Sequence, residues 1–189
     1  MKPLIISIRY TLITTLLLGI AYPLVVTGFA RLVFRDKADG QLISRNGQII
    51  GSRIIGQNFS SDRYFHSRPS AAGSGYDATS SGGSNLAQSN QKLVSRIQDD
   101  VAKYQQYGNS QPVPIDLVTA SGSGLDPDIS PAAALFQVRR VAEIRGISED
   151  SLRNLVQAHI EPRQFGVLGE PRVNVLELNL ALDQLQKQP

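Results

Sequence analysis

The first strong pattern along the chain is an uninterrupted apolar run near its N-terminus. Between Arg9 and Arg31 the sequence reads YTLITTLLLGIAYPLVVTGFA and contains no charged residue. A helix of roughly 20 residues spans the hydrocarbon core of a bilayer, so this run predicts a membrane-spanning helix. Apolar side chains occupy all sides of the predicted helix, which disfavours a core helix of a soluble domain. Pro23 is compatible with a membrane helix, where it produces a kink.

A cleaved signal peptide is the alternative interpretation of the same run. Lys2 and Arg9 would form its basic end, and cleavage near Gly28 to Ala30 would release a secreted protein, such as a hydrolase. The run is longer than the apolar region of most signal peptides, so we favour a retained anchor over residues 1–35. Charges flank both ends of the run in nearly equal number, and composition alone therefore leaves its orientation open.

The apolar pattern after the anchor predicts a β-hairpin. Residues 41–45 and 48–55 would form its strands, and Asn46-Gly47 between them is a strong two-residue turn signal. Both turn positions need positive φ, which asparagine and glycine adopt at low cost.

Residues 59–85 are rich in glycine and serine and poor in aliphatic side chains, a composition typical of a flexible linker. Aromatic and basic residues nevertheless recur along this stretch: Phe59, Tyr64, Phe65, His66, Arg68 and Tyr76. Such side chains are unusual in a linker and typical of contact surfaces. We therefore expect an ordered loop that docks on the domain or on a partner.

Helical periodicity dominates the rest of the chain. Apolar residues at three- and four-residue steps predict a helix that Asn85 caps and Gly108 closes. A short strand is expected over residues 115–119. The C-terminal segment predicts a short strand followed by a helix that Asn174 caps.

Two further helices have clear start and stop signals. Ser130 caps the first, Pro131 occupies its first position, and Gly146 follows its end. Ser148 caps the second, and Pro162 is expected to stop it.

These elements together predict the fold class α+β. The expected architecture is a single N-terminal transmembrane helix over residues 1–35, followed by one small mixed α/β soluble domain over residues 36–189. That domain would contain the β-hairpin, about four helices and the docking loop over residues 59–85.

Composition narrows the chemistry of the chain. It contains no cysteine, which excludes disulfides, cysteine-ligated zinc and cysteine nucleophiles. Neither of its two histidines, His66 and His159, has a spacing that links it to a serine nucleophile, so we expect no catalytic residues and no metal site. The net charge of +3 is mild and the chain has no long Lys/Arg run, so nucleic acid is not an expected partner.

One Gly-Ser loop, ASGSGLDPDIS at residues 120–130, allows three interpretations. A phosphate-binding loop would suit its glycines, but the loop has no lysine, and Asp126 and Asp128 would repel a phosphate. A calcium loop would use these two carboxylates, but the other ligand positions are missing. The favoured interpretation is a structural turn, in which Gly122 and Gly124 provide conformational freedom.

Seven segments, in order, resemble the C subunit of the Kdp potassium-transporting ATPase of bacteria: YPLVVTG, GSRIIGQNF, YFHSRPSA, GGSNLAQSN, VTASGSGLDPDIS, QVRRVAEIRG and GEPRVNVLELNLALD. The match covers nearly the whole chain, including the anchor. The chain has neither a D-K-T-G phosphorylation sequence nor a TVGYG-type potassium filter, so it resembles neither a pump subunit nor a channel.

The resemblance implies a non-catalytic accessory subunit of an ATP-driven, high-affinity potassium import complex. Such a subunit is needed for assembly and is described as a catalytic chaperone that raises the ATP affinity of the pump subunit. The implied partners are a channel-like potassium-binding subunit, a P-type ATPase subunit, a small hydrophobic subunit and membrane lipid. The implied location is the bacterial inner membrane, with a cytoplasmic N-terminus and an extracytoplasmic domain. No cofactor is expected on the chain itself, and ATP would act through the complex.

The resemblance also implies two sets of site residues. Those that would contact a nucleotide are Ser121, Gly122, Ser123 and Gln137. Those that would dock on a partner are Tyr64, Phe65, His66, Arg68 and Pro69. The alternative function is a membrane-anchored module that itself binds a nucleotide through its Gly-Ser loops.

Overall fold

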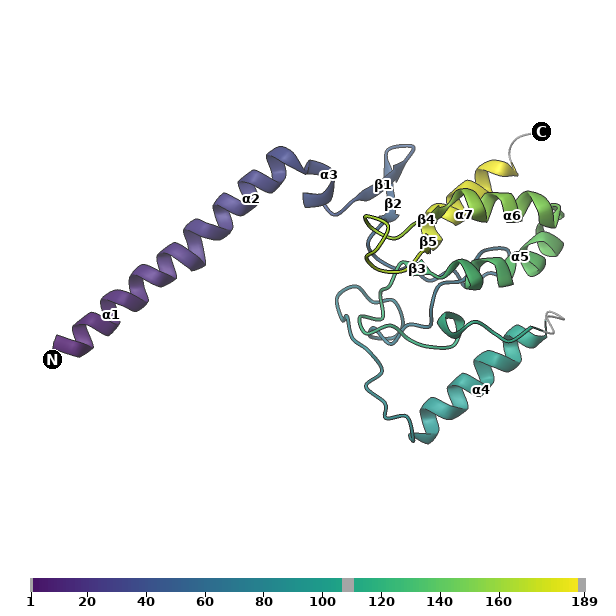
Figure 1. Cartoon of the computed structure of the whole chain (residues 1–189), viewed down its shortest axis with the longest axis horizontal. Helices are drawn as coiled ribbons and strands as arrows, with labels where there is room; N and C mark the ends of the chain where they lie inside the picture. The colour runs from purple at the N-terminus through teal and green to yellow at the C-terminus, as the bar shows by residue number, and fades with distance from the viewer. Residues whose placement is uncertain (1, 107–110, 187–189) are drawn as a thin grey trace. The chain divides into compact units, whose positions relative to one another are not determined.

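The structure is a computed structural model in which residues 2–106 and 111–186 are described. The chain divides into two compact units, Met1–Ser52 and Arg53–Pro189 (Figure 1). The helix end predicted at Gly108 lies outside the described residues. The predicted domain limits remain predictions.

The N-terminal apolar run forms one continuous helix, from α1 (Lys2–Thr14) through the π-helical segment η1 (Thr15–Ala21) to α2 (Tyr22–Val33). Its mean hydropathy reaches 2.0, and it is the one helix within the described residues that is long and apolar enough to cross a membrane. The wider π turns end just before Pro23, whose ring crowds the preceding turn of a regular helix. A short helix, α3 (Arg35–Ala38), follows. The predicted N-terminal apolar helix is confirmed.

The predicted hairpin follows as β1 (Leu42–Arg45) and β2 (Gln48–Ser52), which pair antiparallel. Asn46 and Gly47 form its turn with φ of 53° and 77°, as a two-residue hairpin requires. The second strand is shorter than the predicted 48–55, because the residues beyond it form a turn.

The second unit combines helices with short strands (Figure 1). Its described elements are α4 (Gln91–Gln105), η2 (Ile115–Leu117), β3 (Asp128–Ile129), α5 (Pro131–Arg145), α6 (Glu149–Ala158), β4 (Ile160–Glu161), β5 (Arg172–Asn174) and α7 (Val175–Leu185). The strands form an antiparallel sheet in the order β3-β5-β4, and α6 packs against both α5 and α7. The predicted mixed α/β class is confirmed.

One hydrophobic core holds the second unit together. The largest fully buried apolar side chains come from η2, α6 and α7 and from the segment 59–85: Leu117, Leu152, Leu178, Leu182 and Phe65. Each such side chain contributes about 1.5–3 kcal/mol on burial. A segment without regular structure therefore contributes a central core residue.

The capping residues explain where three helices begin. The hydroxyl of Ser130 accepts from the backbone N–H of the third residue beyond it at 3.2 Å, and the hydroxyl of Ser148 does the same at 3.2 Å. The side chain of Asn174 caps α7 in the same way, at 3.1 Å. Gly146 closes α5 in the left-handed conformation, with φ of 65°. These four predictions are confirmed.

The predicted start of the first helix of the second unit is wrong. The helix begins after Asn90, whose side-chain oxygen accepts from the backbone N–H of Lys92 at 2.9 Å. Asn85 has a φ of 51°, and this left-handed backbone is incompatible with the extended conformation of an N-cap.

Two other predicted boundaries need correction. Residues 115–119 form no strand, because Pro114 leads into the single 3-10 turn η2. The helix α6 ends well before Pro162, since the chain leaves the helix at His159 and enters β4. There the imidazole Nδ1 of His159 lies 2.8 Å from the carbonyl oxygen of Leu155.

Candidate functional site

The candidate site consists of residues 59–85, here called the arm, and the Gly-Ser loop (residues 120–130). The arm contains no helix or strand, yet Phe65 and Ala72 are fully buried in it. A flexible linker would keep such side chains in solvent. The arm is therefore packed as part of its own domain.

Two buried amide side chains bind the arm through its backbone. The Oε1 atom of Gln137 accepts from the backbone N–H of His66 at 2.8 Å, and its Nε2 donates to the carbonyl of His66 at 3.1 Å. Asn179 pairs in the same way with Phe65, at 2.9 Å for both bonds. Each side-chain amide thus pairs with the N–H and C=O of one arm residue, as the backbone of a neighbouring β-strand would.

Two buried arginines extend this contact. Arg140 donates to the carbonyls of Asp62 and Tyr64, the latter at 2.9 Å. Arg145 donates to the carbonyl of Arg63 at 2.9 Å, and its guanidinium lies over the ring of Tyr64, 4.6 Å from the centroid. Both arginines are less than 10% exposed, and Arg145 also forms an ion pair with Asp183 at 2.9 Å. We call Gln137, Asn179, Arg140 and Arg145 together the clamp.

His66 is held neutral inside this arrangement. Burial, and in second place the nearby Arg140, lowers the pKa of His66 to about 4. Its Nε2 lies 3.2 Å from the carbonyl oxygen of Ser61, within the arm itself. The ring is therefore a neutral structural group at neutral pH, with its hydrogen bond inside the chain.

Three of the residues predicted to dock on a partner, Tyr64, Phe65 and His66, are bound by the clamp. The other two, Arg68 and Pro69, follow them in the arm. Phe65 and His66 face the core of their own domain. Arg68 is half-buried and forms an ion pair with Asp126 at 3.0 Å. Tyr64 is also half-buried. Their role toward a partner stays a prediction.

The Gly-Ser loop supports the other side of the arm. The carbonyl of Ser123 accepts from the backbone N–H of Gly82 at 2.8 Å. The carbonyl of Gly124 accepts from the hydroxyl of Ser70 at 2.5 Å. The loop therefore uses its backbone to hold the arm in place.

This packing needs a glycine at position 124. Its φ is +66°, and a Cβ atom there would lie 2.6 Å from the backbone nitrogen of Ala72 and 2.7 Å from the carbonyl oxygen of Gly82. No side chain fits such a space. A Cβ atom on Gly122, in contrast, would meet nothing within 4 Å.

The two carboxylates of the loop are engaged by arginines. Asp126 pairs with Arg68, and Asp128 pairs with Arg172 at 3.0 Å. Burial raises the pKa of Asp128, which Arg172 partly offsets. Within residues 2–106 and 111–186, no group of three or more His, Asp or Glu side chains is placed to hold a metal ion. These contacts support the interpretation of the loop as a structural turn.

The residues implied as nucleotide contacts fall into two places. Ser121, Gly122 and Ser123 are consecutive in the Gly-Ser loop, where the first is buried and the other two are exposed. Gln137 is 1% exposed, and its amide bonds to the arm and to the carbonyl of Ala133. Its contacts are those of the clamp, and nucleotide contact by these four residues stays a prediction.

Sequence reasoning missed three of the four clamp residues. Asn179 lies on a helix whose other buried positions are apolar, and Arg140 and Arg145 lie on α5, whose other buried positions are apolar apart from Gln137. A polar or charged residue at a core-facing position of a helix is the signal that would have found them, because such a group must be paired when it is buried.

The clamp predicts that the same Gln→Leu substitution destabilises the fold far more at position 137 than at an exposed position. Gln137→Leu leaves the buried N–H and C=O groups of His66 unpaired, so the free energy of unfolding is expected to fall by about 3 kcal/mol. Gln184→Leu, at an exposed position of α7, is expected to change it by less than about 0.5 kcal/mol. Guanidinium unfolding of the detergent-solubilised full chain, followed by circular dichroism, measures both. An equal loss of unfolding free energy in the two variants would contradict the role assigned to Gln137.

The Gly-Ser loop predicts a second contrast. Gly124→Ala is expected to lower the free energy of unfolding by at least about 2 kcal/mol, because it adds a clash to a left-handed backbone. Gly122→Ala is expected to be neutral or stabilising by up to about 1 kcal/mol, since it restricts only the unfolded chain. The same unfolding measurement tests both variants, and a destabilised Gly122→Ala would refute this assignment.

Comparison with known proteins identifies the family. A family model described as K+-transporting ATPase, c chain, matches residues 4–184. The chain is 60% identical over 188 residues to the potassium-transporting ATPase KdpC subunit of Koribacter versatilis, covering 100% of this chain and 97% of the relative. It is 55% identical to the subunit of the same name from Acidobacterium capsulatum, covering 95% and 96%. The identity to the one from Rhodopseudomonas palustris (strain BisB18) is 53%, covering 94% and 95%. The chain therefore belongs to the family of KdpC subunits, the c chain of the K+-transporting ATPase.

Proposed function

We propose that this chain is a non-catalytic accessory subunit of an ATP-driven potassium import complex and is needed for its assembly. The observation that carries the proposal is the family match over residues 4–184, which includes both the apolar helix and the second unit. Relatives that align with nearly their full length are named potassium-transporting ATPase subunits.

The chemistry of the clamp supports a non-catalytic role. The buried polar side chains that elsewhere would serve catalysis, such as His66, Gln137 and Arg140, bind the backbone of their own chain. A catalytic group must reach a reacting atom within hydrogen-bond distance. These side chains instead stabilise the fold, as expected for a subunit that acts through contacts.

The partners in this proposal are a channel-like potassium-binding subunit, a P-type ATPase subunit and a small hydrophobic subunit, with membrane lipid around the apolar helix. The domain would lie outside the cytoplasm. Any effect on the ATP affinity of the pump subunit would then be transmitted through other subunits, since a domain on that side has no access to cytosolic ATP. The chain would carry no cofactor of its own.

The complex purified with and without this chain tests the role. With the chain present, we expect potassium-stimulated ATP hydrolysis and an ATP affinity higher by about 5- to 150-fold, the range of an allosteric coupling. Full potassium-stimulated activity without the chain would refute the proposal. Titration of the full chain alone with ATP separates the alternative function: binding that Gly122→Val abolishes would assign the nucleotide to the Gly-Ser loop instead.

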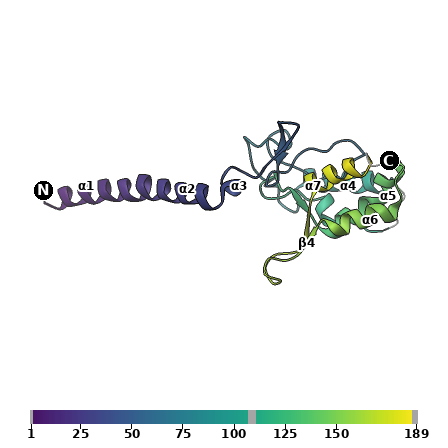
Figure 2. The same cartoon turned by 90° about the horizontal axis from the view of Figure 1, so that it is seen from above.

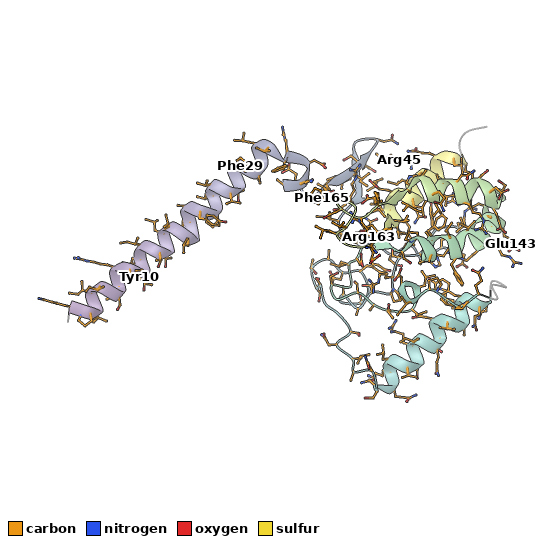
Figure 3. All side chains as sticks on the ribbon, viewed as in Figure 1. Tyr10, Phe29, Arg45, Glu143, Arg163 and Phe165 are labelled. Carbon is orange, nitrogen blue, oxygen red and sulfur yellow. The ribbon has the colours of Figure 1, made fainter. Side chains whose placement is uncertain are left out.

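Because the chain has no native cysteine, a single introduced thiol can report on which side of the membrane the second unit lies. Glu143→Cys places a thiol at an exposed position of α5 (Figure 3). A membrane-impermeant maleimide is expected to label it in intact cells whose outer barrier has been made permeable. Labelling only after lysis would place the domain in the cytoplasm.

A further inference from the structure

A row of three aromatic rings joins α4 to the rest of the second unit. Figure 1 shows α4 apart from α5, α6 and α7, and Figure 2, at a right angle, shows it in line with them, so α4 forms a layer of its own. The ring centroid of Tyr104, in the last turn of α4, lies 6.2 Å from that of Phe136 in α5 and 6.4 Å from that of His66 in the arm. We propose that the contact between His66 and Tyr104 is an acid-sensitive latch, which opens and releases α4 from the core when His66 takes up a proton.

The remainder of α4 contributes little to this attachment. Its other apolar side chains are only half-buried: Leu93, Val94, Ile97 and Val101. Of the residues that the structure describes in α4, Tyr104 alone is buried and belongs to the hydrophobic core. A helix joined to the core through one buried side chain opens at a lower free energy than the core unfolds. Loss of the contact at Tyr104 would therefore free α4 first and expose its apolar side chains.

The neutral form of the His66 ring fits its surroundings, and the charged form does not. The residue is 6% exposed. A carbonyl oxygen only accepts, so Nε2 carries the proton that reaches the carbonyl of Ser61 at 3.2 Å. Protonation adds a second N–H at Nδ1, and among residues 2–106 and 111–186 this nitrogen has no hydrogen-bond partner. The imidazolium would bury a charge and a donor without an acceptor, which is costly.

The charges that face the ring also oppose the imidazolium. Arg140 of α5, which donates to the carbonyl of Tyr64, and Lys103 of α4 both disfavour a further positive charge. Asp62 favours it, with a carboxylate oxygen 3.9 Å from Nε2, but its side chain is 48% exposed and its effect is screened by solvent. Burial, and in second place Arg140, accordingly lowers the pKa of His66 to about 4. Protonation thus sets the ring against Lys103 on the helix that it holds.

A cavity of about 210 Å³ adjoins the ring and is lined by the arm, α4 and η2. Its other titratable side chains cannot supply the acid response. Burial raises the pKa of Tyr76 to about 12, so that phenol stays neutral. Burial also raises the pKa of Asp100 in α4, which Arg96 partly offsets. A carboxyl with a raised pKa takes up its proton more readily in the closed state, so Asp100 holds α4 more firmly as the pH falls. Release by acid is therefore a property of His66.

Proton linkage gives the sign and the size of the effect. The pKa of His66 is about 4 in the closed state and approaches the ordinary value of 6.5 once α4 has moved away. The closed state is fully favoured above the higher value and loses stability as the pH falls from there towards the lower one. Between about pH 7.5 and about pH 5 the ratio of open to closed chains should rise on the order of tenfold, and at most roughly 30-fold, because Arg140 still lies near the ring.

Hydrogen exchange of the detergent-solubilised full chain tests the latch, and it does so independently of the proposed function. Amide protection, corrected for the intrinsic effect of pH on exchange, is compared at about pH 7.5 and about pH 5 by mass spectrometry. We expect the protection of α4 to fall on the order of tenfold, while α7, which has five buried residues, keeps its protection. Unchanged protection of α4, or an equal loss in α4 and α7, would overturn the proposal.

Two substitutions of His66 separate proton uptake from packing. His66→Phe keeps a ring against Tyr104, His66→Gln keeps a donor for the carbonyl of Ser61, and neither new side chain titrates. In either folded variant the protection of α4 should stay the same or rise at the lower pH, because only the opposing effect of Asp100 remains. The control is His159→Gln, at the other histidine of the chain, which should lose α4 protection as the unmodified chain does. An undiminished acid response in a His66 variant, or its absence from His159→Gln, would show that another group controls α4.

Discussion

The pairing of buried side-chain amides with the backbone of the arm is the interaction on which the second unit depends. A segment without strand neighbours would bury unpaired N–H and C=O groups, each at a cost of about 1–3 kcal/mol. Gln137 and Asn179 remove this cost at His66 and Phe65, because a primary amide offers a donor and an acceptor side by side, as a peptide group does. This pairing allows a segment rich in glycine and serine to place Phe65 in the core.

Local signals predicted the parts of the fold that local interactions decide. The caps at Ser130, Ser148 and Asn174 each form hydrogen bonds within three residues, so the sequence contains the whole interaction. The start of α4 shows the limit of this reasoning. Asn85 and Asn90 are equally good caps by type, but Asn85 has a left-handed backbone whereas Asn90 has the extended one that an N-cap needs.

The hydrogen-bond partners of the clamp could not be predicted from the sequence for a different reason. Gln137 and Asn179 bind residues 71 and 114 positions away in the chain, and no spacing rule relates residues at such separations. The same holds for β3, whose two residues become a strand only by pairing with β5. Gln137 also shows why a polar residue in a family motif is ambiguous. A residue that contacts a ligand and a buried amide that stabilises the fold can be of the same type, and their hydrogen-bond partners distinguish them only once the fold is known.

The arm and the β4–β5 loop (residues 162–171) are connected through one short stretch of structure. β5 forms the base of the loop, Asn174 at its end caps α7, and Asn179 within α7 holds the backbone of Phe65. A displacement of β5 would therefore change the position of α7. Asn179 would then lose its two hydrogen bonds to the backbone of Phe65. Packed cores resist such changes as units and do not deform gradually. The backbone position of Phe65 in the arm therefore depends on the same packed contacts that place α7 behind β5.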